Sequence, residues 1–102
     1  MTVSVRTTAR ADRHIAAASD WWHEHRPRAP SLFDDELADA FALLAELPGA
    51  GRQYPHPEIA ELRRLLLSRT RYHVYYVHDV TVREVVVLAV WSAVRGRAPL
   101  LT

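Results

Sequence analysis

The stretch that decides the fold is residues 63–97, which read RRLLLSRTRYHVYYVHDVTVREVVVLAVWSAVRGR. It contains three apolar runs rich in β-branched and aromatic residues, and only short connections separate them. Such runs are typical of neighbouring strands joined as hairpins. Arginines stand at the ends of the runs, so the stretch predicts a compact antiparallel sheet with a cationic rim.

We expect the three strands at residues 62–69, 72–78 and 84–91. The last run holds seven consecutive apolar residues, from Val85 to Trp91. An uninterrupted apolar run indicates a strand buried on both faces, and therefore a central one. The connections at 69–71 and 79–83 suit hairpins, although neither contains glycine.

The segment before this stretch predicts a short strand and a first helix. Residues 3–6 alternate between apolar and polar, which is typical of a strand. Thr7 and Thr8 can cap the helix that follows, and Pro27 ends it near Arg26. The buried stripe of this helix is expected at Ala11, Ile15, Ala18 and Trp22.

A second helix is expected between Ser31 and Pro48. Ser31 and Asp34 have the spacing of a capping box, and Pro48-Gly49 ends the helix. Its apolar stripe is Phe33, Leu37, Ala40, Leu44 and Leu47. Residues 49–58, rich in glycine and proline, are expected to form a loop.

These elements together predict one α+β domain spanning residues 1–102. Their order is β-α-α-β-β-β, with a helical hairpin packed on a small antiparallel sheet. The length of 102 residues agrees with a single domain.

Composition excludes several classes of function. The chain has no cysteine, so it forms no disulfide and no thiolate or zinc–sulfur site. No run of 18 apolar residues occurs and the N-terminus lacks a signal-peptide core, so we expect a cytoplasmic protein without a membrane partner.

Charge is distributed unevenly along the chain. All 13 basic residues are arginine, and the formal net charge is only +1. Residues 63–97 hold seven arginines against two acidic residues, whereas residues 1–62 hold six arginines against ten. An anionic partner would therefore meet a local arginine cluster rather than a general positive field.

The order and the amino-acid sequences of these segments resemble those of the RelE/ParE superfamily, the toxin half of bacterial type II toxin–antitoxin pairs. The likeness covers nearly the whole chain. It is carried by the pair Trp21-Trp22, by the pattern Leu44, Pro48 and Gly51, and by residues 64–67, 70–76, 88–91 and 95–97. The amino-acid sequence of residues 69–76 and 89–91 resembles the ParE branch more than the RelE branch.

The resemblance implies two alternative activities. ParE-like members poison DNA gyrase and are neutralised by a ParD-like antitoxin, with which they form hetero-oligomers, whereas RelE-like members cleave mRNA on the ribosome. In several nuclease members a histidine or tyrosine follows the last strand. Here Ser92, Ala93 and Val94 follow Trp91, and none of them is an acid or base at neutral pH. We therefore expect a gyrase-binding toxin that is not an enzyme. A third alternative is a toxin that has lost its activity and only binds its antitoxin.

Two sets of site residues follow from these alternatives. The set expected to bind the target or the antitoxin is Trp21, Arg64, Arg69, Arg71, Trp91, Arg95 and Arg97. If the protein is a nuclease, the expected catalytic set is Arg71, His73, Tyr75 and Arg95. Trp21 is included because adjacent helical positions diverge by about 100°, so it cannot share the buried stripe with Trp22.

The histidines do not predict a metal site, and no cofactor is expected. His23 and His25 lie two positions apart near a helix end and point in nearly opposite directions. His73 and His78 are an odd number of residues apart, so a regular strand places them on opposite faces. No glycine-rich phosphate loop occurs.

Overall fold

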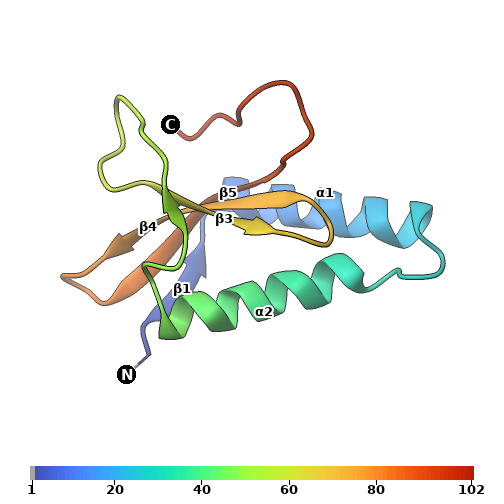
Figure 1. The fold of residues 1–102 in the computed structure, drawn as a ribbon, viewed down its shortest axis with the longest axis horizontal. Helices are drawn as coiled ribbons and strands as arrows, with labels where there is room; N and C mark the ends of the chain where they lie inside the picture. The colour runs from blue at the N-terminus through green and yellow to red at the C-terminus, as the bar shows by residue number, and fades with distance from the viewer. Residues whose placement is uncertain (1) are drawn as a thin grey trace.

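The computed structural model describes residues 2–102 and has two layers, a helical hairpin and a five-stranded sheet. The elements are β1 (Ser4–Thr7), α1 (Ala9–His25), α2 (Leu32–Glu46), β2 (Arg52–Gln53), β3 (Arg63–Leu67), β4 (Tyr72–Asp79) and β5 (Glu84–Ser92). Figure 1 shows both helices on one side of the sheet, and the loop after β2 and the C-terminal segment on the other. The predicted α+β class is confirmed, and the predicted order β-α-α-β-β-β is found with one additional strand, β2.

The sheet is mixed, which corrects the expectation of a purely antiparallel sheet. The strand order is β1-β5-β4-β3-β2. β3, β4 and β5 pair antiparallel as hairpins, but β1 runs parallel to β5. A hairpin fixes the direction of its second strand, whereas β1 meets β5 only after the chain has passed through both helices. The alternation of apolar residues carries no information about that direction.

The predicted ends of the elements needed smaller corrections. Thr8 caps α1, because its hydroxyl accepts a hydrogen bond from the backbone N–H of Ala11 at 3.1 Å. Ser31 precedes α2 but makes no side-chain capping bond, since its ψ of 4° is not the extended conformation of such a cap. The two residues of β2 lie inside the segment 49–58 that was expected to be loop throughout.

The two hairpin turns bend at arginine rather than glycine. Arg71 before β4 has a φ of 66°, and Arg83 before β5 has a φ of 55°. This left-handed conformation is uncommon outside glycine. The side chain of Asp79 supports the second turn by accepting the N–H of Thr81 at 3.0 Å. The absence of glycine from these connections therefore did not prevent tight hairpins.

The main core lies between the helices and the sheet. The stripes expected on the helices point into it, except at Leu47: Ala11, Ala18, Phe33, Leu37, Ala40 and Leu44 are buried there, and Ile15 and Trp22 pack against it. Leu47 is 58% exposed, because α2 ends at Glu46 and the helical periodicity does not extend to this residue. β5 lies inside the sheet, as its apolar run predicted. Side chains alternate along β4, so Tyr72, Val74 and Tyr76 face the helices while Tyr75 and Val77 face the other way. His73 and His78 consequently lie on opposite faces.

A smaller cluster covers the second face of the sheet. It is built on Leu62, Tyr75 and Ala89, and Leu101 of the C-terminal segment packs against it. The guanidinium of Arg10 on α1 holds this segment by donating to the carbonyl oxygen of Leu100 at 3.0 Å.

A β-bulge on β5 sets which residues face each side. Tyr75 and Tyr76 pair with Ala89 and Val87, so Leu88 has no partner on β4. Strict alternation from Val85 and Val87 would turn Trp91 toward the helices. The extra residue shifts the alternation, and Trp91 packs with the second-face cluster instead.

Candidate functional site

Trp91, near the end of β5, is the centre of an aromatic and cationic cluster. The guanidinium carbon of Arg95 lies 4.3 Å from the centre of its ring, and that of Arg97 lies 5.9 Å away. The ring of His14 on α1 approaches within 5.2 Å. The indole nitrogen donates to the carbonyl oxygen of Arg97 at 3.0 Å. These contacts fold the chain after β5 back over Trp91.

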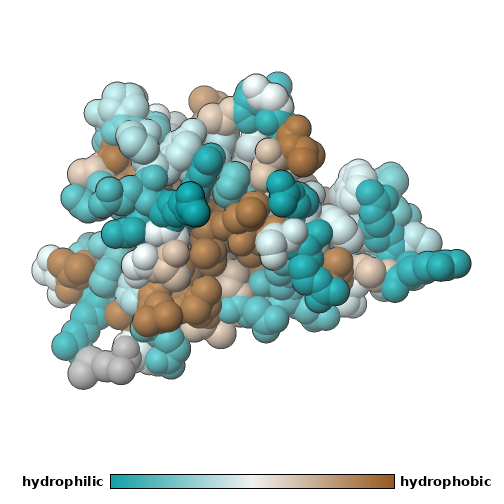
Figure 2. All heavy atoms as spheres, viewed as in Figure 1, coloured by the Kyte–Doolittle hydropathy of each residue, from teal (hydrophilic) through white to brown (hydrophobic). Residues whose placement is uncertain are grey.

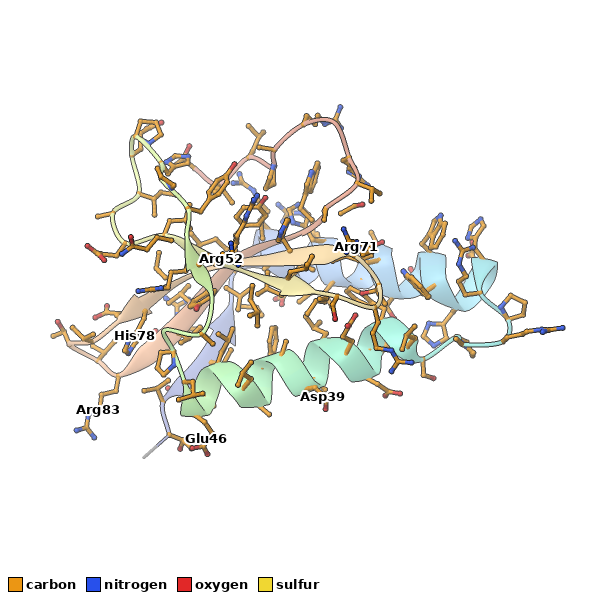
Figure 3. The ribbon with its side chains drawn as sticks, in the orientation of Figure 1. Asp39, Glu46, Arg52, Arg71, His78 and Arg83 are labelled. Atoms are coloured by element: carbon orange, nitrogen blue, oxygen red, sulfur yellow. The ribbon has the colours of Figure 1, made fainter. Side chains whose placement is uncertain are left out.

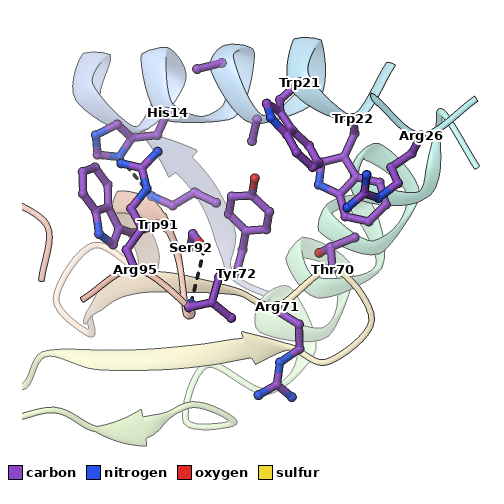
Figure 4. A pocket seen from close by; sticks show the side chains of 14 residues that line it. His14, Trp21, Trp22, Arg26, Thr70, Arg71, Tyr72, Trp91, Ser92 and Arg95 are labelled. Atoms are coloured by element: carbon purple, nitrogen blue, oxygen red, sulfur yellow. Dashed lines mark hydrogen bonds between the residues drawn. The ribbon is translucent and has the colours of Figure 1, made fainter. Parts of the chain in front are cut away.

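A groove runs between α1 and the ends of β4 and β5, and we call it the α1 groove. Its volume is about 640 Å³. Figure 4 shows Trp21, Trp22 and Arg26 at one end and His14, Trp91 and Arg95 at the other. The remaining lining residues are Ala17, Ala18, Thr70, Arg71, Tyr72, Val90, Ser92 and Val94.

The two tryptophans at the first end of the α1 groove differ in environment. Trp21 is 40% exposed, as predicted, and stacks on His25 with the ring centres 4.7 Å apart. The guanidinium of Arg26 lies 4.7 Å from Trp21 and 5.5 Å from Trp22. Among residues 2–102, the buried indole nitrogen of Trp22 has no hydrogen-bond partner. A buried donor without an acceptor costs about 1–3 kcal/mol.

His14 closes the second end of the α1 groove. Its Nδ1 accepts a hydrogen bond from the backbone N–H of Val90 at 3.3 Å, so this nitrogen carries no proton here. Burial lowers the pKa of His14, and the positive charges of Arg10, Arg13 and Arg95 lower that pKa further. His14 is therefore neutral at pH 7.

A second hollow of about 290 Å³ lies on the face of the sheet away from the helices, and we call it the sheet groove. Trp91 and Arg95 line both grooves, so they form the wall between them. The other members of the sheet groove are Tyr54, Arg64, His73, Tyr75, Ser92, Ala93, Gly96, Arg97 and Ala98.

The sheet groove contains one group that can accept a proton near neutral pH. Burial lowers the pKa of His73, and the charges of Arg64 and Arg71 lower it further, so the imidazole is a neutral base at pH 7. Its ring meets Tyr75 edge to face at 5.9 Å. Tyr75 is only 3% exposed, and its hydroxyl accepts from Arg64 at 3.5 Å. The groove thus offers positive charge, one base and a tyrosine enclosed by its neighbours.

The family of the chain follows from a comparison of its sequence with protein-family models. Residues 5–96 match the model of the ParE toxin of type II toxin–antitoxin systems. The chain belongs to this ParE toxin family. None of the curated proteins compared with it matches at a significant level.

Solved structures from both branches of the superfamily resemble this ParE-family chain. The RelBE2 toxin–antitoxin complex of Mycobacterium tuberculosis contains a chain 25% identical to it, with a TM-score of 0.64, covering 90% of this chain and 99% of that one. The chromosomal ParDE system of Pseudomonas aeruginosa gives 19% identity and a TM-score of 0.72, covering 89% and 96%. An arginine mutant of Escherichia coli RelE in the free state gives 16% identity and a TM-score of 0.59, covering 92% and 86%. The last two likenesses concern the fold.

The fold of this ParE-family chain brings most of the residues expected to bind a target or antitoxin to the two grooves. Trp21, Arg71, Trp91 and Arg95 line the α1 groove, and Arg64, Trp91, Arg95 and Arg97 line the sheet groove. Arg71 turns its side chain away from the aromatic wall of the α1 groove (Figure 4). Of the possible nuclease set, His73, Tyr75 and Arg95 share the sheet groove.

Arg69 is separated from the other arginines of the binding set. It lines a third hollow between α2 and β3, together with Leu43, Leu66 and the acidic residues Asp35, Glu36 and Asp39. Figure 2 shows apolar side chains gathered on the surface between these two elements. Because Arg69 lies at a strand end, we expected it to share one cationic rim with the other arginines. The turn after β3 instead places it beside the acidic residues of α2.

His14, Arg26 and Tyr54 belong to the grooves but were not among the expected site residues. His14 and Trp21 are seven positions apart, which is two helical turns, so their spacing on one face of α1 was a usable signal. Tyr54 gave no such signal, because only the folded chain places it 4.5 Å from the guanidinium of Arg64.

Proposed function

We propose that this protein is a toxin that acts by binding DNA gyrase and stabilising its cleaved-DNA state. The observation that carries the proposal is that Ser92 at the end of β5 and Ala93 and Val94 after it line the grooves, and that none of these three residues can act as an acid or base. Trp91, Arg95 and Arg97 provide an aromatic and cationic surface of the kind that anchors protein partners. Membership in the ParE family supports the same target.

A cognate ParD-like antitoxin holds the toxin inactive in this proposal. Two of the similar solved structures are described as toxin–antitoxin systems, which supports a partner of this kind. The antitoxin would cover Trp21 and the arginines around Trp91. A segment that folds on binding gains enough contact area to mask a small domain.

Cleavage of mRNA on the ribosome is the second candidate, because one observation favours it. His73 is a neutral base in a groove that also contains Arg64, Arg95 and Tyr75. An endoribonuclease needs a base for the 2′-hydroxyl and positive charge for the phosphate. In this reading, His73 removes the proton and the arginines stabilise the developing charge.

Two assays separate these candidates. The purified toxin is added to a gyrase supercoiling reaction and, in parallel, to a translation extract in which mRNA ends are mapped. We expect inhibition of supercoiling and accumulation of cleaved DNA, without new mRNA ends. His73→Ala serves as the matched variant and should inhibit gyrase as the native protein does. Codon-dependent mRNA cuts that disappear in His73→Ala would overturn the proposal.

A further inference from the structure

Part of β3 is an open edge of the sheet. β4 pairs with all of its residues, Arg63–Leu67, but β2 on the other side pairs only with Arg63 and Arg64. Among residues 2–102, no strand lies beside Leu65–Leu67 on the side away from β4, and we call this segment the β3 edge. An open edge presents backbone donors and acceptors to which another strand can bind.

The backbone of Leu66 faces outward from the β3 edge. The N–H of Tyr54 donates to the carbonyl oxygen of Leu62 at 2.9 Å, so the backbone groups of Leu62 face the side of β2. The backbone groups of a strand alternate in direction, so those of Leu66, four positions further on, face the same side. β2 does not extend to this position. The N–H and the carbonyl group of Leu66 can therefore pair with a further strand.

The β3 edge also exposes apolar side chains, whereas edge strands are usually protected by charge. Leu66 is 41% exposed, and Leu43 of α2, which lines the same hollow, is 40% exposed. Apolar side chains gather on the surface between these two elements (Figure 2). β1, at the opposite edge of the sheet, carries the exposed Arg6, whose guanidinium pairs with Glu84 at 2.7 Å. The sheet is thus protected at β1 and open at β3.

α2 and β3 run in opposite directions on the two sides of this hollow (Figure 1). The N–H of Thr70, after the end of β3, donates to the carboxylate of Glu36 near the start of α2 at 2.9 Å. At the other end, the guanidinium of Arg63 donates to the carbonyl oxygen of Gly51, beyond the end of α2, at 2.7 Å. The surface formed by α2 and β3 therefore has one end at the start of α2 and the other at β2.

The two ends of this surface carry opposite charge. The end at the start of α2 is mainly acidic, with Asp35, Glu36, Asp39 and Arg69. The end at β2 is mainly basic, with Arg52, Arg63, Arg64 and Glu46. The ion pairs among residues 2–102 include none of these side chains. A rotation of 180° about Leu66 would place the acidic end of one copy against the basic end of another, which is a complementary arrangement.

We propose that two copies of this chain associate through the β3 edge about a two-fold axis. Leu66 of each copy exchanges two backbone hydrogen bonds with Leu66 of the other, which joins the two sheets. The same axis brings the two α2 helices together, with Leu43 of each in the apolar centre. The charges favour a second copy over an unrelated strand, because the axis pairs the acidic end with the basic end twice.

This association goes beyond the proposed function. Leu43 and Leu66 line neither the α1 groove nor the sheet groove. The dimer therefore requires neither gyrase nor an antitoxin, and its test is independent of theirs.

Analytical ultracentrifugation of the purified protein over a series of concentrations tests the inference. The short edge buries a small area, so we expect a weak dimer with a Kd of about 10 μM. Leu66→Pro removes the outward N–H and leaves the ladder with β4 intact, because proline is tolerated where the N–H of an edge strand faces solvent. Leu43→Glu places an unpaired charge in the apolar centre. We expect each variant to weaken dimerisation about tenfold or more.

Val80→Glu is the matched control, because Val80 is an apolar residue, 71% exposed, in the turn between β4 and β5. It adds the same charge outside the proposed interface and should leave the Kd unchanged. Circular dichroism checks that all variants are folded. Equal weakening in Val80→Glu, or a protein that stays monomeric at every concentration, would overturn the inference. In the second case the β3 edge would be left to a strand of another protein.

Hydrogen exchange locates the interface without any substitution. The amide of Leu66 should exchange more slowly as the protein concentration rises. The amide of Val5 is the control on the opposite edge: the N–H of Thr8 donates to Val87 of β5 at 3.0 Å, so that of Val5, three positions away, faces outward. Exchange at Val5 should not depend on concentration. Protection that appears at Val5 and not at Leu66 would place the dimer at β1 and contradict the inference.

A charge exchange tests the two-fold orientation. Asp39 belongs to the acidic end of the surface and Arg52 to the basic end (Figure 3). Asp39→Arg and Arg52→Asp should each weaken the dimer, because each places like charges together across the axis. The two substitutions combined in one chain should restore the native Kd. A combined variant no tighter than the single ones would exclude the two-fold arrangement.

Discussion

At the scale of single residues, Gly51 shows why the pattern Leu44, Pro48 and Gly51 belongs to this fold. The hydroxyl of Tyr76 donates to the carbonyl oxygen of Pro48 at 2.7 Å and accepts the N–H of Gly51 at 2.8 Å. A Cβ at Gly51 would lie 2.7 Å from that hydroxyl and 2.9 Å from the carbonyl oxygen of Arg64. The tyrosine joins the end of α2 to the sheet, and only glycine leaves room for it.

We predict that Gly51→Ala lowers the free energy of unfolding by about 1–3 kcal/mol, because backbone or ring must shift to admit the methyl group. Gly49→Ala is the matched control, since a Cβ there meets nothing within 4 Å. It should change stability by less than about 0.5 kcal/mol. Urea unfolding of the two variants measures the difference, and equal stability would show that this crowding is relieved at no cost.

At the scale of elements, Glu36 on α2 holds the turn between β3 and β4. Its carboxylate accepts the N–H groups of Arg69 at 2.8 Å and Thr70 at 2.9 Å, and the Thr70 hydroxyl at 2.7 Å. Burial by itself would raise the pKa of Glu36, but these hydrogen bonds and the charge of Arg69 outweigh it and lower the pKa. Thr70 is a buried polar residue, only 6% exposed. This link fixes the turn that leads into the α1 groove.

We predict that Glu36→Ala destabilises the protein by about 1–3 kcal/mol, because it leaves the Thr70 N–H and hydroxyl buried without an acceptor. The exposed Asp39 lies on the same helix (Figure 3), and Asp39→Ala is the control for loss of an acidic side chain. Hydrogen exchange at the Thr70 amide should accelerate only in Glu36→Ala. Unchanged exchange there would mean that the turn does not depend on this carboxylate.

At the scale of the whole molecule, the sheet is covered unequally on its two faces. Both helices pack on one face, whereas the other is covered by the loop after β2 and the C-terminal segment. The α1 groove lies between α1 and the ends of β4 and β5, whereas the sheet groove lies on the face away from the helices. None of the helices in residues 2–102 is long and apolar enough to cross a membrane. Within the same residues, no group of three or more histidines or acidic residues is placed to hold a metal ion.

The stability of the whole fold is expected to fall as the pH drops below about 6.5, the ordinary value for histidine. The pKa of His14 and of His73 is lower in the folded protein than in the unfolded chain, so the unfolded chain binds more protons in this window. Protonation therefore favours unfolding, and stability is fully present only above the unfolded pKa.

Denaturant unfolding at a series of pH values between about 5 and 8 measures this effect. The variant that combines His14→Gln with His73→Gln should show a flatter dependence over the same range. An equally steep dependence in that variant would assign the effect to other groups.

Much of this protein is determined by its local sequence. The helices, the Thr8 cap, the three hairpin strands and the helix end near Pro48 follow from periodicity and turn residues, which act between near neighbours. Trp21 could likewise be placed outside the buried stripe from helical geometry alone. The resemblance to the ParE branch then suggested the function that the proposed assays test.

Other features were decided only by the tertiary structure. The parallel pairing of β1 with β5 joins segments about 80 positions apart, and the bulge at Leu88 turns Trp91 to the second face of the sheet. Trp91 lies between the two grooves, beside His14 and Arg95, because of this parallel pairing and this bulge. Local periodicity specifies which side chains are apolar, but strand direction and register are fixed by contacts between distant segments. That is why the sequence predicted the elements, while the site they build required the folded chain.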